Sequence, residues 1–135
     1  MNVLVDTSVW SLALRRDRPA NHAKVRLLAR CLKDGESVLT TGLILQELLQ
    51  GFQGPKQREL VLRRLSMLPC LVPAREDHVE AAELRNKCRR KGVQVGTIDA
   101  LLAQLCIRHE LLMLTDDRDF GLMARHCPLR LLQGG

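Results

Sequence analysis

After Met1 the chain reads NVLVDTS (residues 2–8). Three consecutive apolar residues are followed at once by an acid and two hydroxyl residues. A short, continuously apolar run is typical of a strand covered on both faces, as in a parallel sheet. Open α/β sheets bind their ligands at the carboxyl ends of such strands, which is where Asp6 lies. The stretch therefore predicts an α/β domain with a polar site at the end of its first strand.

Strand-like and helix-like segments alternate along the rest of the chain. Further strands are expected at 37–39, 70–72, 111–114 and 129–132, and helices at 8–16, 21–35, 40–54, 55–68, 76–91, 97–109 and 117–126. Asn21, one of Thr40 or Thr41, and Thr97 are expected to cap helices, and Gly35 and Gly92 to end them. The alternation predicts a mainly parallel sheet of four to five short strands with helices on both sides.

Length and composition limit the class of protein. With 135 residues, 46% of them hydrophobic, the chain suits one domain spanning residues 1–135. No apolar run approaches the roughly 20 residues of a membrane-spanning helix, and no charged segment precedes the first strand, so we expect a soluble, cytoplasmic protein without a membrane partner. The five cysteines lack metal-site spacing and are interpreted as reduced core residues.

Four acids differ from the others because apolar segments surround them. Asp6 follows the first strand, and Asp117 lies just beyond the strand at 111–114. Glu47 interrupts an apolar helix that we expect to be buried on most sides, where a lone carboxylate is unfavourable unless paired or bound to a cation. Asp99 lies in the first turn of another apolar helix. Taken singly, Asp6 and Asp117 also fit turn or cap residues, and Asp99 fits an acid that interacts with the helix dipole.

Together, these acids favour a metal site. If the first strand and the strand at 111–114 are adjacent and parallel, Asp6 and Asp117 share one edge of the sheet. Converging carboxylates repel each other and stay partly protonated unless a divalent cation compensates them. Oxygen ligands select Mg²⁺, with Mn²⁺ as a substitute, rather than zinc. Such an ion polarises a phosphodiester and activates water, so the pattern predicts a metal-dependent nuclease.

The net charge of +6 favours polyanionic partners. The chain has one Trp and two Phe, so an RNA would be held mainly through its phosphates rather than by stacking. The alternative interpretation of the basic clusters is that they are solvated helix faces. The candidate RNA-binding residues are Arg15, Arg16, Arg89, Arg90 and Lys91.

Four short motifs, in this order, resemble those of the PIN-domain ribonucleases, and specifically the VapC-type toxins of prokaryotic toxin–antitoxin pairs. They are VDTSVW at 5–10, QELLQG at 46–51, GTIDALLA at 96–103 and LTDDRDF at 114–120. The resemblance covers the whole chain and implies a PIN-like three-layer α/β/α domain. It further implies an endoribonuclease that dimerises with a second copy and is silenced by a cognate antitoxin filling the active-site groove.

The resemblance also implies roles for single residues. Asp6 and Asp99 would be the principal metal ligands, Asp117 would complete the site directly or through water, and Glu47 would hold a second ion or orient the attacking water. The supporting residues would be Thr7, Ser8, Thr115 and Asp119.

Two assignments stay open within this resemblance. The fourth acid could be Asp116, Asp117 or Asp119, because the three lie so close together in the sequence. Thr7 and Ser8 fit helix-cap residues as well as they fit hydrogen-bond donors to the site.

Two other functions share part of this pattern. A catalytically silent PIN-like module would bind RNA or a protein partner without cutting, but the presence of all four acids argues against it. Phosphotransfer, as in receiver or haloacid-dehalogenase folds, also uses an Asp at the end of a strand. The haloacid-dehalogenase pattern requires a second acid where this chain has Ser8.

Overall fold

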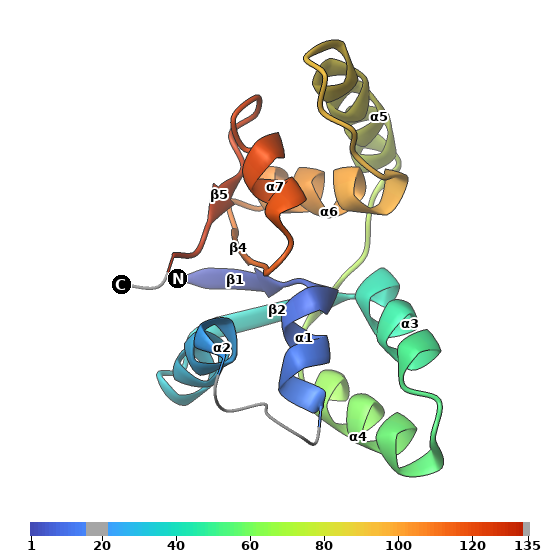
Figure 1. Ribbon diagram of the computed structural model, residues 1–135, viewed down its shortest axis with the longest axis vertical. Helices are drawn as coiled ribbons and strands as arrows, with labels where there is room; N and C mark the ends of the chain where they lie inside the picture. Colours follow the sequence, from blue (N-terminus) through green and yellow to red (C-terminus); the bar gives the residue numbers. More distant parts are fainter. Residues whose placement is uncertain (16–21, 134–135) are drawn as a thin grey trace.

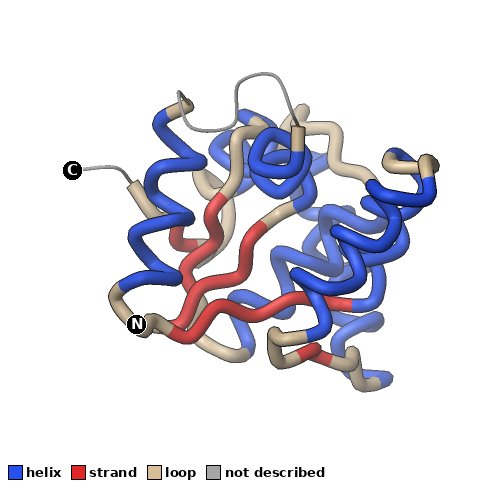
Figure 2. Tube along the Cα trace, turned by 90° about the horizontal axis from the view of Figure 1, so that it is seen from below, coloured by secondary structure: helices blue, strands red, loops and turns tan. Residues whose placement is uncertain are grey.

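Five parallel strands form the centre of the structure, a computed structural model that describes residues 1–15 and 22–133. All four strand pairings are parallel, which confirms the predicted parallel sheet. The strand order is β3-β2-β1-β4-β5, and Figure 2 shows the strands side by side between helices. The strands are β1 (Asn2–Val5), β2 (Ser37–Thr41), β3 (Cys70–Leu71), β4 (Leu112–Leu114) and β5 (Arg130–Leu131).

Helices cover both faces of this sheet, which confirms the predicted three-layer α/β/α architecture. In Figure 1, α1, α2 and α4 lie on one side of the strands, and α5, α6 and α7 lie on the other. No described helix is long and apolar enough to cross a membrane. The helices are α1 (Thr7–Leu14), α2 (Ala23–Lys33), α3 (Gly42–Gly51), α4 (Pro55–Ser66), α5 (Arg75–Arg90), α6 (Thr97–Arg108) and α7 (Arg118–Met123).

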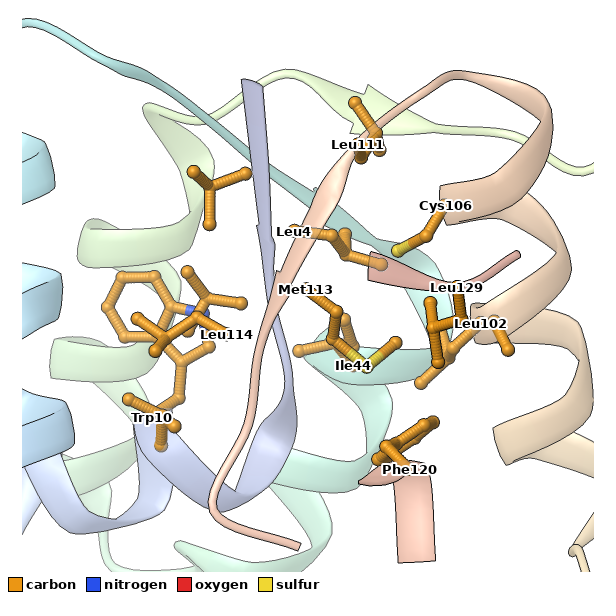
Figure 3. Packing of buried hydrophobic residues seen from close by; sticks show 14 of the residues in the cluster. Leu4, Trp10, Ile44, Leu102, Cys106, Leu111, Met113, Leu114, Phe120 and Leu129 are labelled. Atoms are coloured by element: carbon orange, nitrogen blue, oxygen red, sulfur yellow. The ribbon is translucent and has the colours of Figure 1, made fainter. Parts of the chain in front are cut away.

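The core lies on both faces of β1 and β4, because successive side chains of a strand point to opposite faces. Val3, Leu4 and Val5 are fully buried, as are Met113 and Leu114. Figure 3 shows Leu114 and Trp10 on one side of the strands, and Met113 on the other side with residues of α6. Burial of each large apolar side chain contributes about 1.5–3 kcal/mol, which explains why the first strand carries no polar residue between Val3 and Val5.

Strand register places the carboxyl ends of β1 and β4 next to each other. Val5 pairs with Leu114, and the amide of Asp6 donates a hydrogen bond of 2.9 Å to the carbonyl of Leu114. The predicted adjacency of these two parallel strands is therefore confirmed. The side chains that follow them, Asp6 and Thr115, meet at one edge of the sheet.

Several predicted helix ends differ from the structure. Helix α1 ends at Leu14 rather than near Arg16, which lies outside the described residues. The N-cap of α2 is His22, whose Nδ1 accepts a bond of 3.1 Å from the amide of Lys24; Asn21, the predicted cap, lies outside the described residues. Helix α6 begins after Gly96 without a side-chain cap, so the prediction that Thr97 caps it is wrong.

Other local predictions are confirmed or need correction. Thr41 caps α3 through a bond of 3.1 Å from the amide of Ile44 to its Oγ1, and β2 extends to Thr41 rather than ending at Leu39. Strand β3 lies at the sheet edge, as its flanking prolines predict. Cys70 is exposed on this strand, so the interpretation of every cysteine as a core residue is wrong for Cys70.

An ion pair joins α5 to α6 away from the strands. Asp77 is 0% exposed, and its Oδ2 accepts a bond of 2.8 Å from the amide of Ala74 and one of 2.5 Å from Nη1 of Arg108. A buried carboxylate needs such partners, and Arg108 supplies the opposite charge. The pair fixes α6, which carries Asp99, against α5.

Candidate active site

Asp6 is held at the end of β1 by two hydroxyl groups from different segments. Ser8 Oγ and Thr115 Oγ1 each donate a hydrogen bond of 2.9 Å to Asp6 Oδ2. The hydroxyls in turn accept bonds of 2.9 Å from the amide of Asp116 and 3.0 Å from the amide of Asp117. Since a hydroxyl has one proton to donate, these amide bonds leave that proton free to point at Asp6. The carboxylate, 6% exposed, is therefore fixed in orientation.

Glu47 is linked to the same segment by Thr7. Thr7 Oγ1 donates a bond of 3.0 Å to Glu47 Oε1 across the gap between α1 and α3. Neither Thr7 nor Ser8 caps α1 through its side chain, so both hydroxyls serve the acids instead. The expectation that α3 is buried on most sides is wrong, because only Ile44 and Leu48 of this helix are fully buried. Glu47 is half-buried at the boundary with solvent.

Asp99 shows that the acids lie near one another. Its pKa is raised from 3.8 to about 6, first by burial, then by the negative charges of Asp6, Asp117 and Glu47, and last by that of Asp119. Desolvation and like charges both disfavour an ionised carboxylate. Three of the predicted acids therefore lie close enough to Asp99 to influence it, and we call the four together the acid cluster: Asp6, Glu47, Asp99 and Asp117.

The three acids after β4 have different surroundings. Asp117 is the N-cap of α7, and its Oδ1 accepts a bond of 2.9 Å from the amide of Asp119. Asp116 is exposed and turns to His22, whose Nε2 lies 3.6 Å from Asp116 Oδ2. Asp117 and Asp119 raise the pKa of Asp99, whereas Asp116 is not among the causes. This placement favours Asp117, the acid with the larger influence of the two, as the fourth member of the cluster.

Comparison with known proteins identifies the family. The family model described as "PIN domain" matches residues 3–125. The chain belongs to the PIN domain family. The resemblance read from the four short motifs is thereby confirmed for the family.

Relatives of this PIN domain in sequence are named ribonucleases. The chain is similar to VapC ribonuclease Mb1587 of Mycobacterium bovis, with 30% identity over 125 residues that cover 91% of this chain and 92% of that protein. The same figures apply to Ribonuclease VapC11 of Mycobacterium tuberculosis. These relatives support the VapC-type resemblance along nearly the whole chain.

Solved structures share the fold at lower sequence identity. VapBC2 from Rickettsia felis, bound to a promoter DNA fragment, matches with a TM-score of 0.74 and 19% identity over 98% of both chains. VapC20 from Mycobacterium tuberculosis, a toxin that cleaves the sarcin-ricin loop, matches with a TM-score of 0.67 and 19% identity over 96% of this chain and 99% of that one. These structures therefore support the PIN fold by their backbone similarity, although their sequence identity to this chain is low.

The donor chemistry of the acid cluster fits a hard divalent cation. All the candidate ligands are carboxylates, as Mg²⁺ and Mn²⁺ prefer. One oxygen of Asp6 and one of Glu47 accept hydrogen bonds, and among the described residues no group donates to the second oxygen of either. In residues 1–15 and 22–133, no three His, Cys, Asp or Glu side chains are positioned to coordinate one ion. The carboxylates of the acid cluster would therefore have to move closer together to bind a cation.

The predicted basic residues separate into different places. Arg15 lies beyond the carboxyl end of α1, whereas the acid cluster lies at the start of that helix. Arg16 lies outside the described residues. Arg89 lines a pocket between α5 and the loop before α6, whereas Arg90 and Lys91 are exposed at the end of α5 and do not line it. Only Arg89 of this group therefore lies in a pocket beside α6.

Sequence reasoning missed two contacts in the wider surroundings of the site. His22 reaches Asp116 from the start of α2, and no local pattern in the sequence links the two residues. Arg85 faces the loop before α6 but belongs to a run of charged residues on α5, where its sequence context resembles that of its solvated neighbours. Only the packing of α5 on α6 distinguishes Arg85 from the solvated charged residues around it in the sequence.

Proposed function

We propose that this PIN domain is a Mg²⁺- or Mn²⁺-dependent endoribonuclease and the toxin of a toxin–antitoxin pair. The observation that carries the proposal is the orientation of Asp6 by Ser8 and Thr115 at the carboxyl end of β1. Burial first, and then the charges of Asp6, Asp117 and Glu47, also raise the pKa of Asp99, so these carboxylates influence one another. A divalent cation stabilises such a site because it relieves the repulsion between the carboxylates. The relatives named VapC ribonuclease support RNA as the substrate.

The residues of the site have different roles. Asp6 and Asp99 would hold the cation, and Asp117 would complete the site. Ser8 and Thr115 keep Asp6 in one orientation, and Thr7 does the same for Glu47. A bound divalent cation supplies polarisation of the phosphodiester, activation of water and stabilisation of the leaving oxygen.

A cleavage assay with matched variants tests the activity. Purified protein is incubated with an end-labelled RNA in Mg²⁺, in Mn²⁺ and in excess EDTA, and the fragments are mapped. We expect internal cuts that EDTA abolishes, and no detectable cleavage by Asp6→Asn or Asp99→Asn, while circular dichroism shows an unchanged fold. Cleavage that persists in EDTA, or in either variant, would falsify the proposal.

Calorimetric titration tests the metal site without relying on activity. Parent protein is titrated with Mn²⁺ near pH 6, where Asp99 is about half protonated. We expect binding to release protons, seen as a heat that changes with the ionisation enthalpy of the buffer. Asp99→Asn should lose that buffer dependence and bind Mn²⁺ more weakly. Equal Mn²⁺ affinity in parent and variant would remove Asp99 from the ligand set.

The antitoxin, which the resemblance implies fills the active-site groove, would also cover an apolar groove on the side of α1, α2 and α4. A groove of about 450 Å³ lies between α1, α2 and α4, and Leu32 and Met67 at its edge are 47% and 82% exposed. Arg15 and Arg64 also line it, which suits a partner with an apolar segment flanked by acids. Several structures of the same fold are VapBC complexes, and one is a toxin-antitoxin complex from Klebsiella pneumoniae. The homodimer stays a prediction, which sedimentation of the purified chain tests.

A further inference from the structure

A small basic pocket lies beside the first turn of α6. It has a volume of about 260 Å³ and is formed by the last turns of α5 and the loop that leads into α6. We call it the arginine pocket, and its lining residues are Arg85, Arg89, Gln94, Val95 and Gly96. No step of the proposed reaction uses it.

One of the two arginines of the pocket is held in place, and no described ion pair neutralises either of them. Arg85 and Arg89 are four residues apart on α5 and therefore lie on one face of the helix. Arg85 Nε donates a bond of 2.7 Å to the carbonyl of Val95, which fixes its guanidinium against the loop. Among the described ion pairs, none involves Arg85 or Arg89. The pocket therefore presents positive charge that no carboxylate of the described chain neutralises.

The arginine pocket and the acid cluster share Gly96 as a wall. A Cβ placed on Gly96 would lie 3.9 Å from Oδ2 of Asp99, so the carboxylate stands directly against this backbone. Gly96 also lines the pocket with the two arginines. A ligand that reaches both the arginine pocket and the acid cluster needs an anionic group in the pocket and a second group beside the acid cluster.

We propose that the arginine pocket binds a backbone phosphate of the RNA, adjacent to the phosphodiester that is cut. The inference rests on the proposed endoribonuclease function, since an RNA that brings one phosphate to the acid cluster carries the next phosphate one nucleotide away. A guanidinium presents a planar fork of donors that matches phosphate oxygens, and the amide of Gln94 adds a further donor. A strand of phosphates must pass four carboxylates, and cations beside them offset the repulsion.

Direct binding measurements test this assignment. Asp6→Asn protein in EDTA, which binds RNA without cutting it, is titrated into a labelled single-stranded RNA by fluorescence anisotropy at several salt concentrations. Adding Arg89→Ala should weaken binding about tenfold and reduce the slope of log K against log salt by about 0.7, the value for one phosphate contact on a single strand. Arg63→Ala removes one exposed charge from α4, on the opposite side of the sheet, and should change affinity less than about twofold.

A neighbouring variant distinguishes a pocket from diffuse charge. Arg90 is exposed next to Arg89 but does not line the pocket, so Arg90→Ala should weaken binding less than Arg89→Ala does. With the catalytic acids intact, Arg89→Ala should raise KM for RNA and leave kcat nearly unchanged, as expected for uniform binding. Equal losses in Arg89→Ala, Arg90→Ala and Arg63→Ala would overturn the inference.

Two further outcomes separate this inference from the proposed function. If the parent cuts RNA but Arg89→Ala binds and cuts like the parent, the pocket does not bind phosphate and only the inference fails. If Arg89→Ala leaves RNA binding unchanged but weakens binding of the antitoxin, the pocket holds an acidic protein side chain instead. If the Asp6→Asn protein shows no salt-dependent RNA binding at all, the ribonuclease proposal and this inference both fail.

Discussion

Asp6 depends on its two hydroxyl partners for its orientation, and this dependence can be measured. Ser8→Ala removes one bond of 2.9 Å to Oδ2 and leaves the amide of Asp116 without its acceptor. Loss of an outer hydrogen bond to a metal ligand typically lowers metal affinity or activity by about 10–100-fold, and we expect that loss in Mn²⁺ titration and RNA cleavage. Ser11→Ala, on the same helix, is the control and should behave like the parent. Equal behaviour of the two variants would contradict the role of Ser8.

Asp99 makes the metal-free protein sensitive to pH. Its folded-state pKa of about 6 lies above the ordinary 3.8, so between these values the unfolded state loses this proton first. Stability from this group is therefore present at low pH and falls as pH rises through 6, by on the order of 2 kcal/mol once partial solvent exposure is allowed for. Urea unfolding in EDTA at pH 5 and pH 7.5 should show about half of this fall in the parent, because at pH 5 the unfolded state has already lost the proton.

The control for this prediction is the neutral variant. Asp99→Asn has no proton to lose, so its stability should fall less between pH 5 and pH 7.5, and at pH 7.5 it should exceed that of the metal-free parent. A stability difference between parent and variant that stays constant over this pH range would show that Asp99 does not titrate near 6.

Single residues of the site were predictable from the sequence where an acid interrupts an apolar run. Asp6, after three apolar residues, and Asp99, within an apolar helix, were found in this way. The partial exposure of Glu47 was not predictable from the sequence. Helix α3 has apolar residues on two sides, and the sequence does not show that only one of these sides is buried. The approach of His22 to Asp116 depends on tertiary packing and leaves no local signal.

At the scale of elements, α5 and α6 end in the same turn with different residues. After α5, Gly92 has φ of 80°, and the amides of Gly92 and Val93 bond back to Arg89 and Cys88. After α6, Glu110 takes the equivalent place with φ of 55°. This left-handed conformation suits glycine and is unfavourable for other residues.

The comparison predicts opposite effects for two substitutions. Glu110→Gly should stabilise the protein by about 1 kcal/mol, and Gly92→Ala should destabilise it by a similar amount, because the side chain must adopt the left-handed region. Thermal unfolding should move by roughly 4 °C in each direction. A melting temperature lowered by Glu110→Gly would contradict the argument.

The ends and positions of helices and strands were predicted correctly where glycine or proline determines them. Glycine ended α5, and prolines kept β3 at the edge of the sheet. The prediction failed at Thr97, since the backbone at Gly96 already has the extended conformation of an N-cap. Threonine is a good cap residue, but propensity alone does not determine which of two neighbouring residues takes the position.

At the scale of the whole molecule, the strand order explains where the site lies. From β1, the chain moves to β2 on one side and later to β4 on the other, so the connections diverge between β1 and β4. Open α/β sheets bind ligands at this divergence, outside the carboxyl ends of the strands. Asp6 and Thr115 lie there. The sequence predicted parallel neighbours but contains no local signal for the full order.

The groove between α1, α2 and α4 gives a test of the antitoxin proposal at the same scale. The chain's single tryptophan, Trp10, lines this groove, so docking of a partner should change its fluorescence. Leu32→Glu and Met67→Glu place a charge in the apolar contact, and we expect each to weaken binding of a cognate antitoxin by more than about tenfold. Val79→Glu, at an exposed apolar residue of α5 outside the groove, is the matched control.

RNA cleavage by the free protein separates this surface from the active site. The acid cluster lies at the carboxyl ends of the strands, whereas Leu32 and Met67 lie at the far ends of α2 and α4. Both groove variants should therefore cut RNA at the parent rate and resist inhibition by the antitoxin. Loss of cleavage in the free variants would mean that the groove takes part in catalysis. Unchanged inhibition would place the antitoxin elsewhere on the molecule, with the acid cluster as the next surface to test.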